Sequence, residues 1–79
     1  MTYSSRVLRV RLRELLHDND VSAYRLAQEV KTIKPAQLYA IVRGDRLPSL
    51  DTVDDILNAL ARITKKTFTP NDVLEYEPD

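Results

Sequence analysis

The stretch Val21–Gly44, VSAYRLAQEVKTIKPAQLYAIVRG, decides the fold of this chain. Its first half begins with Ser22, a residue type that caps helix amino ends, and places apolar side chains on one helical face as far as Val30. Its second half starts at Pro35, which suits the first helical position, and stops at Gly44, which supplies the left-handed backbone conformation that often follows a helix. The stretch therefore predicts two short helices joined by a turn.

The second of these helices has a buried side and a free side. Leu38, Ile41 and Val42 recur at i, i+3 and i+4, so we expect them to face the core. Because only residues 31–34 separate the two helices, the helices must cross steeply. The residues left for the outer side are Lys34, Ala36, Gln37, Tyr39, Ala40 and Arg43.

These residues resemble the helix-turn-helix domain of the phage lambda repressor and Cro type, often called XRE-like. The resemblance rests on SAYRLAQEV, IKPAQLYAIVRG, LPSLDTVDDILNAL and TPNDVLEYEPD, and covers nearly the whole chain from about Leu12 onward. The last segment is similar to a small subgroup of regulators that end in an aspartate, an aliphatic pair, Glu-Tyr and Pro. The resemblance implies a sequence-preferring DNA-binding transcriptional regulator, a repressor acting as a homodimer, with the helix at about 35–43 in the major groove.

Two features depart from the family pattern. The family usually carries Gln at the second position of the first helix, where it contacts a phosphate, and this chain has Ala23. The positions that usually contact base edges are here Pro35, Ala36 and Ala40, none of which can form a bidentate hydrogen bond. The turn is also one residue longer than usual. We therefore expect modest base specificity that depends more on phosphate contacts and DNA shape than on direct readout.

The rest of the chain completes an all-α fold, a compact bundle of about five short helices around the helix-turn-helix. Residues 6–13 fit two patterns, an alternating strand and a helical face. We favour a short strand at about 7–11 that pairs with the segment at about 74–77, within one chain or between two, because arginines would then face glutamates. Ser49 caps the next helix, which we expect to end before Ile63, and Thr69 with Asp72 forms a capping box for a last helical turn.

Composition indicates a single small domain, residues 1–79, without cysteine or a long apolar run. Formal net charge is zero, but residues 1–46 carry nine Lys or Arg and five Asp or Glu, whereas residues 47–79 carry three and seven. One part of the molecule is thus suited to phosphates and the other is not. We expect a cytoplasmic protein that makes no use of a membrane.

No arrangement of residues indicates catalysis, a metal site or a cofactor. His17 is the only histidine, and a histidine at a helix end is explained by the helix dipole. Asp51, Asp54 and Asp55 lie early in a predicted helix, where the same dipole stabilises acids without any cation. We therefore expect a protein that is not an enzyme.

The expected partner is double-stranded DNA, and the expected contacts divide by chemistry. Lys34, Arg43 and Arg46 would neutralise phosphates, and the amino end of the first helix, with Ser22 and Tyr24, would hold another. The remaining predicted contacts come from Ala36, Gln37, Tyr39 and Ala40. For Gln37 the alternative is a capping side chain that reaches back to Lys34, and for Tyr39 it is packing on the neighbouring helix. The competing function is a protein-interaction module or antitoxin that binds a partner protein through this surface.

Overall fold

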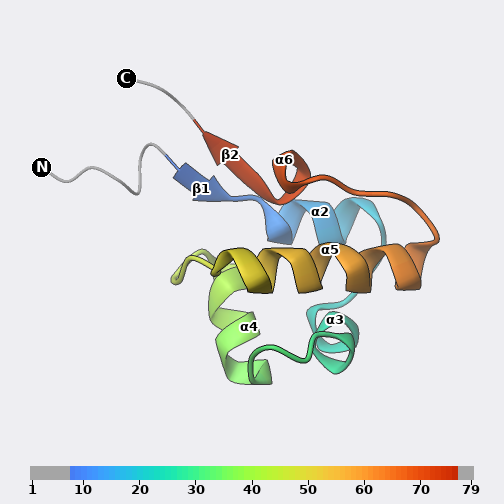
Figure 1. Cartoon of the computed structure of the whole chain (residues 1–79), viewed down its shortest axis with the longest axis horizontal. Helices are drawn as coiled ribbons and strands as arrows, with labels where there is room; N and C mark the ends of the chain where they lie inside the picture. The colour runs from blue at the N-terminus through green and yellow to red at the C-terminus, as the bar shows by residue number, and fades with distance from the viewer. Residues whose placement is uncertain (1–7, 77–79) are drawn as a thin grey trace, which may run out of the picture.

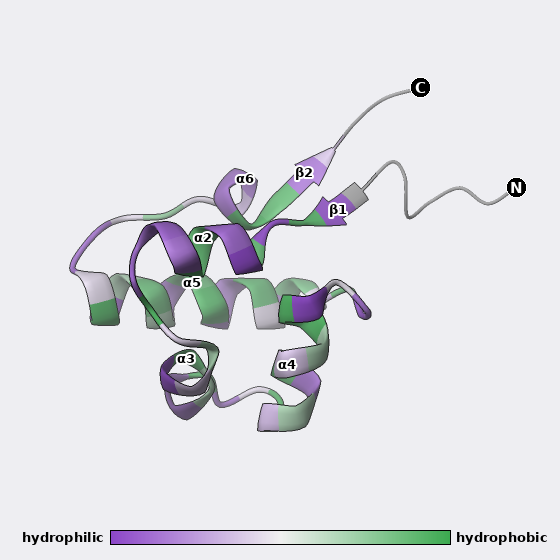
Figure 2. Ribbon diagram, turned by 180° about the vertical axis from the view of Figure 1, so that it is seen from behind, coloured by the Kyte–Doolittle hydropathy of each residue, from purple (hydrophilic) through white to green (hydrophobic). Residues whose placement is uncertain are grey.

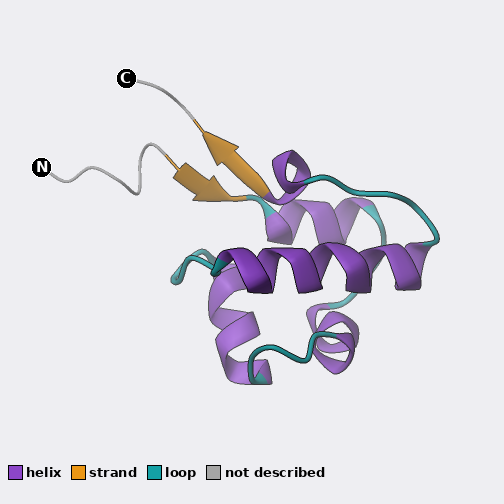
Figure 3. Ribbon diagram, viewed as in Figure 1, coloured by secondary structure: helices purple, strands orange, loops and turns teal. Residues whose placement is uncertain are grey.

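The structure is a computed structural model that describes residues 8–76 (Figure 1). In the views of Figures 1 and 2, α3 and the start of α4 lie on one side of α5, and α2, α6 and the two strands lie on the other. The elements follow in the order β1 (Leu8–Val10), α2 (Leu12–Asp18), α3 (Ala23–Glu29), α4 (Pro35–Arg43), α5 (Leu50–Thr64), α6 (Pro70–Val73) and β2 (Leu74–Tyr76) (Figure 3). The predicted all-α fold of five helices is confirmed.

The two helices of the deciding stretch begin and end where the sequence predicts. Ser22 precedes α3, and its hydroxyl oxygen accepts a hydrogen bond of 3.0 Å from the backbone N–H of Arg25. Pro35 occupies the first turn of α4. Gly44 follows α4 with φ of 86°, and its backbone N–H donates to the Ile41 carbonyl at 3.0 Å. A side chain at this position would strain the left-handed backbone.

Helix α5 runs two residues past the predicted end. Ser49 caps it as expected, accepting from the Thr52 N–H at 3.2 Å. At the other end the Thr64 hydroxyl donates to the Leu60 carbonyl at 2.7 Å, and Lys65 then takes the left-handed conformation, with φ of 64°, that ends the helix. Figure 2 shows hydrophobic and hydrophilic residues alternating along α5, as in an amphipathic helix.

The short N-terminal strand is confirmed, and it pairs within one chain. Strands β1 and β2 are antiparallel, with Arg9 opposite Glu75, and the two side chains form an ion pair of 2.7 Å. The backbone N–H of Arg11 donates to the Val73 carbonyl at 2.6 Å, so the pairing continues into α6. Residues 7 and 77 of the predicted pairing lie outside the described residues.

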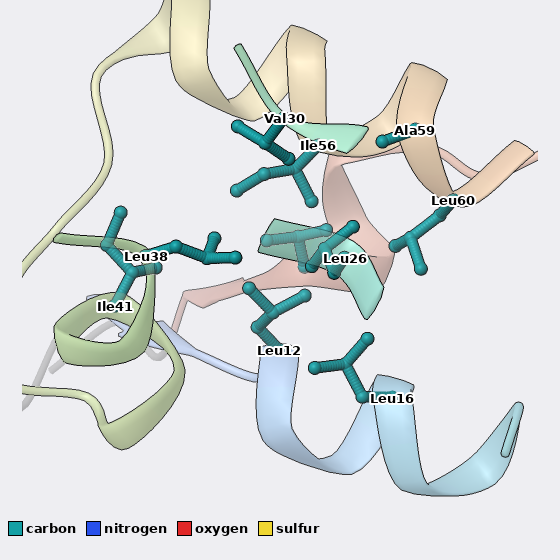
Figure 4. Packing of buried hydrophobic residues seen from close by; sticks show 10 residues of the cluster. Leu12, Leu16, Leu26, Val30, Leu38, Ile41, Ile56, Ala59 and Leu60 are labelled. Carbon is teal, nitrogen blue, oxygen red and sulfur yellow. The ribbon is translucent and has the colours of Figure 1, made fainter. Parts of the chain in front are cut away.

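The core joins all five helices. The largest side chains with under 2% exposure are Leu12, Leu26, Leu38, Ile41, Ile56, Leu60 and Val73. Figure 4 shows Leu26 of α3 between Leu12 of α2 and Ile56 of α5, with Leu38 and Ile41 of α4 closing one side. Each such side chain stabilises the fold by about 1.5–3 kcal/mol through burial. Only the inner side of α4 thus packs against the core.

Candidate nucleic-acid interface

Helix α4 turns one side to the core and the other to solvent. Leu38 and Ile41 are each 1% exposed, and Val42 packs at the core margin, as the helical spacing predicts. Figure 1 shows α3 nearly end-on while α4 lies in the plane of the view, so the two helices cross steeply. The outer side of α4 is therefore exposed to solvent next to α3.

The predicted contact residues lie at the start of α3 and along α4 and its following loop. Lys34, Ala36, Arg43 and Arg46 are exposed, whereas Gln37, Tyr39 and Ala40 are half-buried. Both Ser22 and Tyr24 are exposed at the amino end of α3, with Tyr24 at 66%. In Figure 2 the ribbon is pale at the amino-terminal end of α4, so the first residues of this helix have intermediate hydropathy.

The alternative reading of Gln37, as a capping residue, is confirmed. Its side-chain oxygen Oε1 accepts a hydrogen bond of 3.2 Å from the backbone N–H of Lys34, at the start of α4. The Nε2 amino group of Gln37 has no hydrogen-bond acceptor among residues 8–76. Gln37 thus braces the first turn of α4 and keeps two N–H donors for a ligand.

Arg43 has a neighbour that the sequence analysis missed. Its Nε lies 2.9 Å from Oδ2 of Asp45, across Gly44, and both side chains are more than half exposed. The turn made at Gly44 brings the acid back toward the end of α4. A phosphate must therefore compete with the Asp45 carboxylate for this guanidinium.

The turn between α3 and α4 is held by a residue from α5. The Oδ2 atom of Asp55 accepts two backbone hydrogen bonds, from Lys31 at 2.8 Å and from Thr32 at 3.0 Å. Residues 30–34 leave the helical path between α3 and α4, so their N–H groups need acceptors from elsewhere. From its position early in the helix we attributed Asp55 to the helix dipole alone, so its hydrogen bonds to the turn were not predicted.

Two further contacts tie the same turn to α5. The Thr32 hydroxyl donates to Oγ1 of Thr52 at 3.4 Å, and Thr52, only 3% exposed, also accepts from Ser49 at 3.0 Å. At the end of α3, Arg62 Nε lies 3.3 Å from Oε1 of Glu29. Hence α5 holds the end of α3 and the turn that leads to α4.

Ala23 takes the position where the resemblance led us to expect Gln. It is half-buried and packs against the core, so it contributes to the packing of α3. The turn from Val30 to Lys34 spans five residues between the bounds of α3 and α4. Alanine has no side-chain group that could make the phosphate contact that the resemblance assigns to Gln at this position.

A hollow at the amino end of α3 borders this surface. It is lined by Leu16, His17, Asp20, Val21, Ser22, Arg25 and Ile63, none of which belongs to α4. Among the residues that the structure describes, no group of three or more His, Cys, Asp or Glu gathers as a metal ligand set. In that part of the chain no helix combines the length and apolar character needed to cross a membrane.

Comparison with protein families agrees with this geometry. Residues 11–79 match the Cro/C1-type HTH DNA-binding domain. The chain belongs to this family. The match extends from Arg11, just before α2, to the end of the chain, and so includes the helix-turn-helix pair and α5. Searches of curated proteins and of solved structures found no match.

Membership of the Cro/C1-type family assigns the two crossed helices their places. Helix α3 is the first helix of the helix-turn-helix and α4 is the second, which in such domains contacts base edges in the major groove. The chain is therefore a DNA-binding regulator domain.

Proposed function

We propose that this Cro/C1-type domain is a transcriptional repressor that binds double-stranded DNA as a homodimer. Each protomer would lay α4 in the major groove of one half-site. The observation that carries the proposal is the division of α4, with Leu38 and Ile41 in the core and Lys34 and Arg43 exposed to solvent. The domain would act on DNA in the cytoplasm. Its function would require no catalytic group.

Side-chain chemistry assigns the remaining roles. Ala36 and Ala40 would pack on thymine methyl groups, and the Tyr39 hydroxyl would reach a phosphate oxygen. The amino end of α3, marked by Ser22 and Tyr24, would hold a further phosphate, because helix amino ends favour anions. The methyl groups of these alanines cannot form hydrogen bonds with base edges, so base specificity should be modest.

Gln37→Ala is expected to narrow the gap in affinity between preferred and random duplexes. The free Nε2 donors of Gln37 are the main hydrogen-bonding group that α4 offers to base edges, and a good base contact is worth about 1–3 kcal/mol. The measurement is a titration of both proteins against a duplex selected from random sequences and against a scrambled one. If the ratio of the affinities for the selected and the scrambled duplex stayed the same, Gln37 would not contact bases.

Arg43→Ala and Asp45→Asn are expected to change DNA affinity in opposite directions. Arg43→Ala removes a phosphate contact and should weaken all duplexes alike by about tenfold. Asp45→Asn removes the carboxylate that holds Arg43 and repels phosphate, and should tighten binding by about threefold to fivefold at low salt. Both effects can be measured by fluorescence anisotropy with a labelled duplex. Weaker binding by Asp45→Asn would show that the ion pair positions Arg43 for DNA.

A second candidate is a protein partner for the same surface, alone or in an antitoxin that also binds DNA. The exposed Pro35 and Ala36 at the start of α4 favour it, because they offer an apolar surface without hydrogen-bonding groups. A protein-interaction module would leave mixed duplex DNA unbound even at low salt. Titration with such DNA therefore separates the DNA-binding regulator from a module that binds protein alone.

A further inference from the structure

The hollow at the amino end of α3 has an apolar floor and a volume suited to a small molecule. Its volume is about 410 Å³, within the range of about 300–1,000 Å³ that small-molecule sites occupy in proteins. Leu16 of α2 is 4% exposed, and Val21 and Ile63 are half-buried at the margin of the core. Figure 1 shows the ends of α2 and α5 on one side of the molecule, where the chain turns from α2 into α3. Three segments of the chain thus line a hollow whose floor can bury an apolar group.

One side chain of each charge borders this hollow, and the two do not form an ion pair. Arg25 of α3 and Asp20, in the turn before α3, are both exposed and both line the hollow. The hydrogen bond of Arg25 to Ser22 comes from its backbone, and within residues 8–76 neither the Arg25 guanidinium nor the Asp20 carboxylate has a partner. The cation and the anion are therefore both available to a ligand.

The lining of the hollow favours one class of ligand over three others. A purely apolar ligand would leave the charges of Arg25 and Asp20 unmatched. A phosphate ester would be repelled by Asp20, and a divalent cation would find a single carboxylate among the lining residues beside an arginine that repels it. A small zwitterion with an apolar side chain matches both charges and the floor.

We propose that the hollow is an effector site for a free apolar α-amino acid. At neutral pH such a molecule carries a carboxylate and an ammonium group on the same carbon. The guanidinium of Arg25 would bind the carboxylate with two parallel hydrogen bonds, and the ammonium would donate to Asp20. The side chain of the amino acid would pack on Leu16, Val21 and Ile63, which removes apolar surface from water.

Occupancy of the hollow would weaken binding to DNA. This consequence rests on the proposed function, which places a DNA phosphate at Ser22, and Ser22 also lines the hollow. The ligand carboxylate held by Arg25 would repel that phosphate. Because coupling between two binding sites is reciprocal, DNA would weaken binding of the amino acid by the same factor.

Isothermal titration calorimetry without DNA tests the hollow, with phenylalanine and leucine as probes. We expect dissociation constants of about 0.1–1 mM, because the ligands are small and few contacts hold them. Phenethylamine lacks the carboxylate, phenylpropionate lacks the ammonium and glycine lacks the apolar side chain, so each should bind at least about tenfold more weakly. The proposal is wrong if neither amino acid binds at about 10 mM, or if the amine or the acid binds as tightly as phenylalanine.

Arg25→Gln and Asp20→Asn each remove one charge from the hollow and should leave the fold intact. The Arg25 side chain has no partner to lose within residues 8–76, and asparagine accepts the left-handed backbone of Asp20, whose φ is 58°. Each variant should bind phenylalanine about tenfold more weakly. Arg13→Gln and Asp18→Asn make the same changes at exposed residues of α2 outside the hollow and should bind it as the wild type does. Wild-type affinity in both Arg25→Gln and Asp20→Asn, with folding verified by circular dichroism, would place the ligand elsewhere and overturn the proposal.

Anisotropy titrations of a labelled duplex with and without saturating phenylalanine test the effector role. We expect the amino acid to weaken duplex binding by about fivefold or more. Unchanged or tighter duplex binding at saturation would overturn this role. If the wild type binds no duplex at all, the proposed function fails, and calorimetry of the same variants still decides whether the hollow binds amino acids.

Discussion

Binding of this domain to duplex DNA is expected to weaken by about 10³-fold to 10⁵-fold when salt rises from 50 to 200 mM. Each protomer offers three exposed cations on α4 and its flanks, Lys34, Arg43 and Arg46, so a dimer displaces counterions at about six phosphates or more. Every phosphate contact adds nearly one unit to the slope of log affinity against log salt. A protein with zero net charge would otherwise show little such dependence.

Arg43→Ala provides the internal control for this salt titration. It removes one phosphate contact from each protomer, so the slope should fall by about two for the dimer. The measurement is a series of anisotropy titrations of one duplex at four or five salt concentrations, for wild type and variant. A flat response of the wild type would contradict groove binding and favour a protein partner for α4. If the wild type responds steeply to salt and Arg43→Ala has the same slope of log affinity against log salt, DNA binding stands but Arg43 does not contact a phosphate.

Local sequence rules predicted the ends of the helices well. The cap at Ser22 and the left-handed Gly44 lie where helix-end preferences place them, and the N–H of Thr69 donates to Oδ2 of Asp72 at 2.8 Å, as a capping box requires. That arginines would face glutamates across the two strands was also predicted from the alternation in the two segments, and Arg9 opposite Glu75 is the pair that the structure forms. These features depend on a few neighbouring residues or on one simple periodicity.

Contacts between distant segments were the features that sequence did not predict. Asp55 lies 23 and 24 residues beyond the backbone groups that it binds, and nothing in its own helix distinguishes it from Asp54. The pairing of Arg43 with Asp45 depends on the direction that the chain takes after Gly44. For Gln37, two partners were plausible from sequence, and the geometry of the first turn decided for the capping role. Side-chain contacts of this kind require the packed positions of two elements.

Asp55→Ala is expected to destabilise the domain by about 2 kcal/mol and to loosen the turn before α4. The substitution leaves the N–H groups of Lys31 and Thr32 without their carboxylate acceptor. A hydrogen bond to a charged group contributes about 1.5–3 kcal/mol net, and less at an exposed site such as this one, because water can replace the lost acceptor. For a domain of this size the melting temperature should fall by roughly 8–16 °C. DNA affinity should fall by more than the loss of folded protein accounts for, because the turn sets the direction of α4.

Asp54→Ala is the matched control, since it removes the neighbouring carboxylate of the same helix. The Asp54 carboxylate accepts one hydrogen bond of 3.4 Å, from Asn58 in its own helix, so its loss should change stability by no more than about 0.5 kcal/mol. Asp55→Asn keeps a side-chain oxygen that can accept from the turn and should fall between the two. Thermal melts together with duplex titrations at a temperature where all variants are folded separate stability from positioning. If Asp55→Ala behaved as Asp54→Ala does in both measurements, the turn would hold its shape without α5, and its direction would have to come from the packing of Leu26 and Leu38 alone.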